Sequence, residues 1–159
     1  MPTPTSKTEA LDKLRRYCAY QERCHREVRT KLLDLGLRGD DLETIIAALV
    51  EENFLNEERF ARSFSSGKFH IKHWGRNRIR QELKMRDVPD YCIRKALEEI
   101  EETEYRATLE AILVKRAEKF TGLEAFALRH KLAQFAVQRG FEAELAWQVL
   151  DEMGMTDGA

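Results

Sequence analysis

The stretch GRNRIRQELKMRDVPDYCIRKALEEI, residues 75–100, decides the fold because the spacing of its apolar residues recurs twice elsewhere in the chain. Counted from Val88, apolar residues stand at offsets −9, −5, 0, +5, +8 and +9. The same offsets hold around Leu37 and Phe141 once residues 38–40 are treated as an insertion. The three sets are Ile79, Leu83, Val88, Ile93, Ala96 and Leu97; Val28, Leu32, Leu37, Ile45, Ala48 and Leu49; and Leu132, Ala136, Phe141, Ala146, Val149 and Leu150. This repetition predicts tandem supersecondary units that bury their apolar faces against one another.

Each unit is expected to hold three helices, so that the fold is all-α: three tandem three-helix repeats forming an elongated, curved array. Ser6 and Asn56 are suited to cap helix N-termini, and Gly36 is suited to end a helix. The expected repeats are residues 6–55, 56–103 and 104–153, followed by a disordered tail at 154–159. The expected helices are 6–20, 24–35, one starting after Asp40 or Asp41, one capped by Asn56, one following Gly75, one opened by Pro89-Asp90, and 104–119, 123–138 and 142–153.

Composition argues against several classes of protein. The 159 residues carry a formal net charge of −1, lack an apolar signal region at the start, and contain no run near the ~18 apolar residues of a membrane span. Three cysteines without other marks of secretion favour free thiols in a cytoplasmic protein. Eight scattered glycines form no phosphate loop, so we expect no nucleotide hydrolysis and no enzyme activity.

Two groups of residues suggest a metal site only weakly. Cys18, Cys24 and His25 lack the spacing of a zinc knuckle, and His70 and His73 have no third ligand nearby in sequence. We therefore expect neither a metal nor another cofactor.

Charge is segregated along the chain. Residues 59–86 contain nine Lys and Arg against a single acid, whereas 40–58 contain seven acids and no Lys or Arg, and 98–104 add five acids. One interpretation is that these charges lie on solvated helix faces and pair with one another. The other is a basic stripe aimed at phosphate, with acidic helices facing a protein partner.

The basic stripe would lie on the helix after Gly75. Four-residue spacing places Arg76, Arg80 and Lys84 on one face, opposite Ile79 and Leu83. Such a stripe can follow a phosphate backbone, and nothing in it indicates base-specific recognition. The candidate binding residues of the middle repeat are Arg76, Arg80, Lys84, Lys72, Arg78 and Lys68, and the second choice is Arg15, Arg16, Arg23, Arg26 and Lys31 near the N-terminus. The aromatic residues among them, Phe69 and Trp74, are interpreted as core rather than as stacking platforms for bases.

A more specific pattern runs through the middle of the chain. The run FLNEERFA at 54–61, followed by Gly75, Ile79 and the Glu82-Leu83 pair, resembles the bacterial RecX family of regulators of the RecA recombinase. Segments 27–32 and 139–141 are also similar to that family. The chain departs from it at two points: Asn56-Glu57 replaces an acidic pair, and Arg86-Asp87 replaces the usual Lys-Gly.

The resemblance implies an elongated, monomeric, non-catalytic modulator that binds in the groove of RecA–DNA filaments. It would restrain their ATPase and strand exchange, and so act in homologous recombination, DNA repair and the SOS response. The alternative is a free-standing helical protein that binds single- or double-stranded DNA, or RNA, through phosphate contacts of the basic stripe. Only the first function gives the acidic segments 40–58 and 98–104 a partner.

Overall fold

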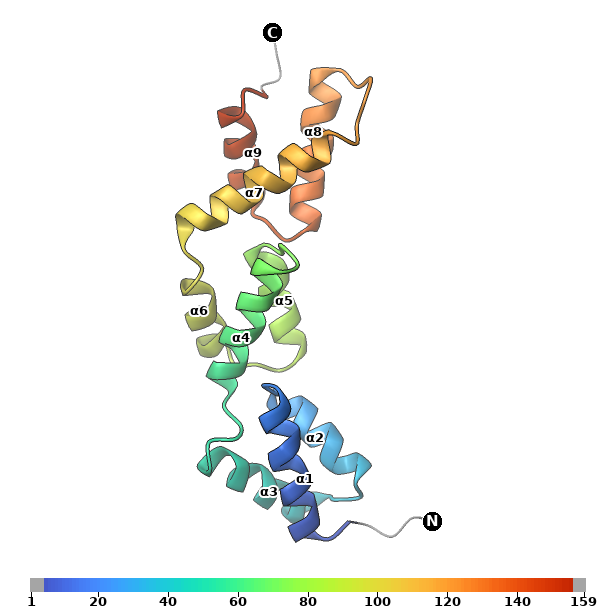
Figure 1. Ribbon diagram of the computed structural model, residues 1–159, viewed down its shortest axis with the longest axis vertical. Coiled ribbons are helices and arrows are strands. Elements are labelled where there is room, and N and C mark those ends of the chain that lie inside the picture. Colours follow the sequence, from blue (N-terminus) through green and yellow to red (C-terminus); the bar gives the residue numbers. More distant parts are fainter. Residues whose placement is uncertain (1–4, 156–159) are drawn as a thin grey trace. The chain divides into compact units, whose positions relative to one another are not determined.

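The structure, a computed structural model, describes residues 5–155, and within that range it contains nine helices and no strand (Figure 1). The helices are α1 Lys7–Tyr20, α2 His25–Asp34, α3 Gly39–Glu51, α4 Glu57–His70, α5 Arg76–Met85, α6 Asp90–Glu98, α7 Glu102–Ala117, α8 Ala125–Gln138 and α9 Ala143–Glu152. The predicted all-α class is confirmed. Of the expected tail 154–159, residues from 156 onward lie outside the described part.

Two predicted helix caps are present. The Ser6 hydroxyl accepts a hydrogen bond from the Glu9 amide at 3.2 Å, and the Asn56 side chain accepts one from the Arg59 amide at 2.9 Å. Each bond satisfies a backbone donor that has no partner in the first turn of a helix. The third helix, α3, begins earlier than expected, at Gly39, whose φ of 58° lies in the left-handed region.

The same turn closes the second helix of every repeat. The residue before each anchor has a left-handed φ: 88° at Gly36, 60° at Asp87 and 101° at Gly140. In each turn the anchor's amide donates to the carbonyl five residues earlier: Leu37 to Leu32 at 3.0 Å, Val88 to Leu83 at 3.2 Å and Phe141 to Ala136 at 3.0 Å. This is the bond that ends a helix through a left-handed residue. Aspartate tolerates that conformation better than most side chains, so the substitution at Asp87 leaves the repeat intact.

The chain divides into two compact units. Among the described residues, the first comprises 5–64 together with 83–96, and the second comprises 65–82 together with 97–155. Helices α4 and α5 therefore each contribute one end to each unit. The elongated, curved arrangement of the repeats stays a prediction.

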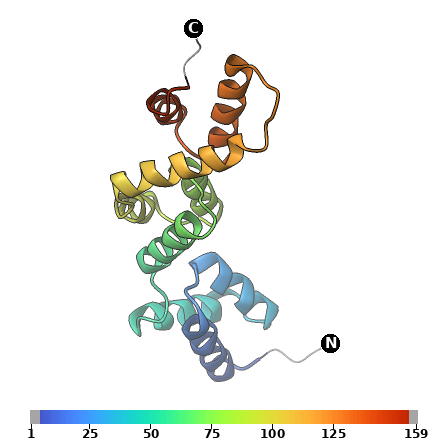
Figure 2. The same cartoon turned by 45° about the horizontal axis from the view of Figure 1, so that its top comes forward.

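The core of the first unit lies among α1, α2 and α3, which pack against one another in both views (Figures 1 and 2). Its fully buried side chains include Leu14, Leu32 and Leu49. In the second unit α7 packs against α8 and α9, around the buried Tyr105 and Phe141 rings, whose centroids are 5.0 Å apart.

A close backbone approach joins the start of α5 to the turn between α8 and α9 within the second unit. The Gly75 amide donates to the Arg139 carbonyl at 2.8 Å, and the Asn77 amide donates to the Gly140 carbonyl at 2.9 Å. A Cβ atom on Gly75 would lie 2.3 Å from the Gly140 carbonyl carbon, so only glycine fits there. This contact places the first residues of α5 beside the first residues of α9.

None of the helices in the described part is long and apolar enough to cross a membrane.

Candidate nucleic-acid interface

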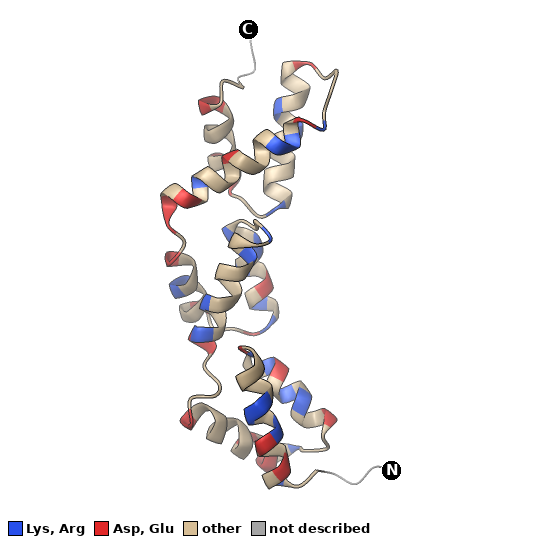
Figure 3. Ribbon diagram, in the orientation of Figure 1, with Lys and Arg blue, Asp and Glu red and all other residues tan. Residues whose placement is uncertain are grey.

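A basic hollow lies on the first unit between α1 and α2, and we call it the α1–α2 hollow. Its volume is about 490 Å³, and its lining contains four cations, two tyrosines and no carboxylate. The lining residues are Lys13, Arg16, Tyr17, Tyr20, Arg23, Lys31 and Leu35. Figure 3 shows the basic residues of these two helices in blue.

The Tyr17 ring contacts two cations of the hollow. The Arg23 guanidinium lies 3.7 Å from the centroid of the Tyr17 ring, and its Nε donates to the Tyr17 carbonyl at 3.1 Å. On the same ring the Lys31 ammonium lies 5.6 Å from the centroid. An aromatic ring attracts cations at these distances, so Tyr17 holds two positive groups without neutralising them.

Three cations of the hollow have no ion pair with any residue between 5 and 155: Lys13, Arg16 and Lys31. All three are exposed. Arg23 differs, because it lies 3.8 Å from the Glu27 carboxylate and is largely covered. The hollow therefore combines one fixed arginine with three cations that can pair with an external anion.

Arg15 and Arg26, which were expected to join this surface, are engaged elsewhere. Arg15 is hydrogen-bonded to Asp12 at 2.9 Å and to Glu52 at 2.6 Å. The hydrogen bond with Glu52 raises the pKa of Arg15 and lowers the pKa of Glu52. Arg26 donates to the Met85 carbonyl. The expected stripe from Arg15 to Lys31 is thus reduced to the members that line the hollow.

The expectation of an open stripe is wrong at Arg76. Its side chain is only 18% exposed and forms ion pairs with Glu102 at 2.6 Å and Glu142 at 3.0 Å. Its guanidinium carbon lies 3.8 Å from the centroid of the Tyr105 ring. Burial lowers the pKa of Arg76, but the hydrogen bonds that Arg76 donates to the two carboxylates outweigh it, so the pKa is raised overall. Arg76 joins α5 to α7 and α9 rather than facing solvent.

Tyr105 completes this cluster. Its hydroxyl accepts a hydrogen bond from the Arg76 amide at 2.9 Å and donates one to Glu142. Burial, together with the negative charge of Glu142, raises the pKa of Tyr105. The phenol therefore stays protonated and serves as a fixed donor.

The rest of the predicted stripe on α5 is more accessible. Ile79 and Leu83 are fully buried, as predicted for the opposite face. Among residues 5–155, Arg80 is hydrogen-bonded only to Asn77 of its own helix, at 2.9 Å, and Lys84 is exposed without a partner.

Two of the three remaining candidates of the middle repeat lie beside the Trp74 ring. Arg78 and Lys68 lie 4.1 and 5.0 Å from the centroid of Trp74, which is half-buried. Lys72 is exposed. Phe69 is buried, which confirms its interpretation as core.

The acidic segments pair largely with the chain's own cations. Glu43 binds Arg29, Glu52 binds Arg15, and Glu102 binds Arg76. The interpretation of mutually paired charges therefore holds at these positions, and these carboxylates are not open docking groups for a partner.

Two of the three cysteines are core residues, and the third, Cys92, is partly buried. Cys18 and Cys24 are buried and free, and burial raises the pKa of each thiol to about 11. No group of three or more His, Cys, Asp or Glu side chains suited to a metal ion occurs in the range that the structure covers.

Sequence reasoning missed several cations that the fold gathers. Lys13 stands three and four residues before Arg16 and Tyr17, a spacing that could have marked it as part of one helix face. Another group, Lys115, Arg116, Lys119 and Arg139, lines a second hollow in the second unit. Their signal was weak because they come from two separate segments: the end of α7 with the residues that follow it, and the residue that follows α8.

These features define a class: an all-helical protein of tandem three-helix repeats with basic hollows on its surface. The models of the second and third three-helix domains of RecX match residues 56–97 and 102–150. The regulatory protein RecX of Prosthecochloris aestuarii is 30% identical over 91% of this chain and 93% of its own length. The chain belongs to the RecX family.

Two further relatives differ from each other in how much of their length this chain covers. The regulatory protein RecX of Salmonella paratyphi A is 28% identical over 89% of this chain and 92% of its own. For the protein of that name from Lactococcus lactis the identity is 26%, and this chain spans only about half of it, 52%. Among solved structures, RecX from Lactobacillus salivarius matches with a TM-score of 0.86 at 19% identity, over 94% of this chain and 97% of that one.

Proposed function

We propose that this chain modulates RecA recombinase, mainly as an inhibitor, by binding RecA–DNA filaments and restraining their ATPase and strand exchange. Membership in a family whose relatives are named regulatory protein RecX supports this role. In this proposal the chain acts as a monomer in the cytoplasm, needs no cofactor and performs no chemistry of its own.

The α1–α2 hollow is the observation that carries the DNA side of the proposal. Lys13, Arg16 and Lys31 line it without ion pairs in the described part of the chain, and no carboxylate lies among them. Phosphate oxygens would replace water around these groups and release counterions from the strand. Contacts of this kind fix position on a strand and carry no sequence information.

On α5 the proposed interface includes Arg80 and Lys84 but not Arg76. Lys84 is exposed, and in the described part of the chain Arg80 has only a neutral partner, within its own helix. Both remain available to an external anion. Arg78, Lys68 and Lys72 stay secondary candidates.

The test is the rate of ATP hydrolysis by RecA on single-stranded DNA while the chain is titrated in. We expect the rate to fall as the chain is added. For the double variant Arg16→Gln/Lys31→Gln, the concentration that gives half-inhibition should rise at least about tenfold. Each substitution removes a hydrogen bond to a charged phosphate, and such a bond contributes about 1.5–3 kcal/mol. The matched control, Arg38→Gln/Arg94→Gln, removes the same charge from exposed positions outside the hollow and should inhibit like the wild type.

A free-standing nucleic-acid-binding protein is the second candidate, supported by the same unpaired cations. Binding to DNA alone and to the RecA–DNA filament separates the two functions. Tighter binding to the filament supports the modulator. Equal affinity for bare DNA and filament, with no effect on ATP hydrolysis, would leave only the second candidate.

A further inference from the structure

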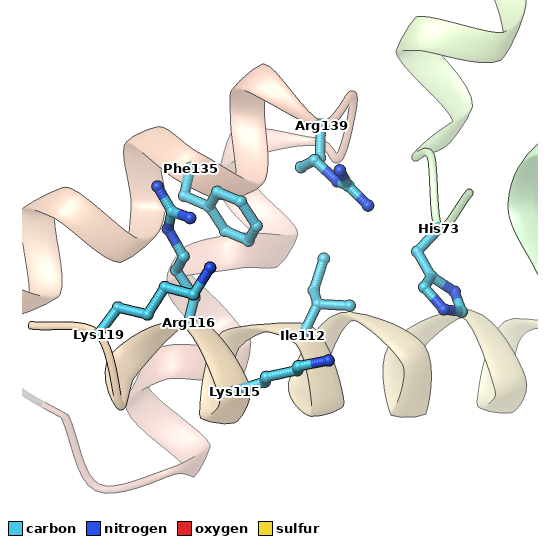
Figure 4. Close-up of a pocket in the computed structure, with 7 residues that line it drawn as sticks. All are labelled: His73, Ile112, Lys115, Arg116, Lys119, Phe135 and Arg139. Atoms are coloured by element: carbon cyan, nitrogen blue, oxygen red, sulfur yellow. The ribbon is translucent and has the colours of Figure 1, made fainter. Parts of the chain in front are cut away.

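A second hollow lies within the second unit, where α7, the end of α8 and the segment before α5 meet; we call it the α7–α8 hollow. Its volume is about 270 Å³. It is lined by His73, Ile112, Lys115, Arg116, Lys119, Phe135 and Arg139 (Figure 4). Four of these residues are cations and none is a carboxylate.

The arginines of the hollow flank one aromatic ring. Figure 4 shows Phe135 between Arg116 and Arg139, whose guanidinium carbons lie 4.7 and 5.8 Å from the ring centroid. With Ile112, this ring makes one part of the wall apolar. The hollow therefore offers an apolar surface beside a concentrated positive charge.

Arg139 is held in place by the protein itself. Its Nη2 donates to the carbonyl of Lys72 at 2.5 Å. His73, the residue after Lys72, adopts a left-handed φ of 57°. Its side chain points toward α7 at the end of the hollow away from Arg116 and Lys119 (Figure 4). The position of the guanidinium thus does not depend on a bound molecule.

The positive charge in the hollow is poorly compensated. The buried Nε atoms of Arg116 and Arg139 and the buried Nδ1 of His73 have no hydrogen-bond partner within the described residues. Burial, followed by the nearby charges of Arg78 and Arg116, lowers the pKa of Arg139. Gathering like charges in a partly dry site costs free energy that an anion would offset.

We propose that the α7–α8 hollow binds the phosphate group of a nucleotide, with the attached sugar or base against Phe135 and Ile112. Guanidinium and ammonium groups together suit a phosphate, which presents several acceptor oxygens and up to two negative charges. The nucleotide can be a free nucleoside phosphate or one unit of a nucleic-acid strand. This site stands independently of RecA regulation, because none of its residues enters the argument for that function.

Pyrophosphate is the first probe, with binding measured by calorimetry and by the shift in melting temperature at constant ionic strength. Lys115→Gln should weaken pyrophosphate binding about tenfold, since a hydrogen bond to a charged group is lost. Lys131→Gln is the matched control, because it removes one exposed lysine of the same unit from outside the hollow and should bind like the wild type. Both lysines are exposed, so neither change should affect folding. The absence of binding, or equal weakening in both variants, would overturn the site.

Two further probes identify the source of the phosphate. Thymidine triphosphate and a single-stranded thymidine oligomer are each tested for competition with pyrophosphate, in the wild type and in Lys115→Gln. Competition by the triphosphate alone assigns the hollow to free nucleotides, and competition by the oligomer assigns it to a strand. If neither competes, the nucleotide assignment fails. If the chain inhibits RecA but does not bind pyrophosphate, the proposed function holds and this site is wrong. If the chain binds pyrophosphate but does not inhibit RecA, the site holds and the proposed function is wrong.

Discussion

The cations of the α1–α2 hollow and the arginine at the start of α5 carry the same charge and play different parts. Arg16 and Lys31 are exposed and have no ion pair among residues 5–155, whereas Arg76 is 18% exposed and bound to two carboxylates. The difference lies in which acids the fold brings near. The partners of Arg76 are 26 and 66 residues away in the sequence, at Glu102 and Glu142.

The density of basic residues along the sequence is therefore a poor guide to a binding surface. Residues 59–86 are the most basic stretch of the chain, yet their leading arginine stabilises the contact of α5 with α7 and α9. The more open cations lie in a stretch whose sequence also contains acids. Whether a cation is available to an external anion depends on which charged groups lie near it in the folded protein.

The largest expected effect is on stability, from Arg76→Ala. We expect a loss of about 2–3 kcal/mol in the free energy of unfolding, somewhat below the ~3–5 kcal/mol for breaking a fully buried pair, because Glu102 keeps access to water. Chemical denaturation followed by helical circular dichroism measures it. Arg80→Ala on the same helix is the control and should stay within about 0.5 kcal/mol of the wild type. Equal stability of the two variants would show that Arg76 is only a surface charge.

A smaller loss is expected from Tyr105→Phe. The change removes the hydroxyl that bonds to the Arg76 amide and to Glu142, and it leaves both groups with one partner fewer. We expect a cost of about 1–2 kcal/mol, typical of an unsatisfied buried polar group. Tyr91→Phe is the control, since Tyr91 is 53% exposed. If Tyr105→Phe proved as stable as the control, the cluster would not depend on the phenol.

The fold could be predicted from the sequence because its signals are local and repeated. The apolar spacing around Leu37, Val88 and Phe141 predicted three turns, and each turn contains the same type of backbone hydrogen bond. Ser6 and Asn56 predicted two helix starts. A cap or turn depends on a few neighbouring residues, and the apolar spacing is averaged over three copies. The start of α3 was missed because Gly39 takes a left-handed φ there, which the acidic pair after it did not indicate.

The site was less predictable because ion pairs join distant segments. No local pattern indicates that Arg76 will meet Glu142, or that Arg139 will lie beside Lys115 and His73. Periodicity correctly placed Ile79 and Leu83 inside, but it describes only which face of a helix is buried. It cannot say whether the polar face meets solvent or the carboxylates of another helix.

The smallest effect on stability is expected from Arg16→Gln/Lys31→Gln, and this variant tests the other side of the comparison. Both side chains are exposed and have no ion pair in the described part of the chain, so the free energy of unfolding should change by less than about 0.5 kcal/mol. The dependence of DNA or filament binding on salt should nevertheless change. Each phosphate contact accounts for roughly 0.7–0.9 of the slope of log affinity against log salt, so losing two should lower it by about 1.4–1.8.

The control for that variant, Arg38→Gln/Arg94→Gln, lowers the net charge equally and should keep the wild-type slope. If both double variants reduced the slope alike, binding would follow the overall charge of the protein rather than the hollow. If Arg16→Gln/Lys31→Gln instead lost stability, these cations would be structural, as Arg76 is. Unchanged stability with a smaller slope would show that the hollow holds phosphate with charges that the fold does not need.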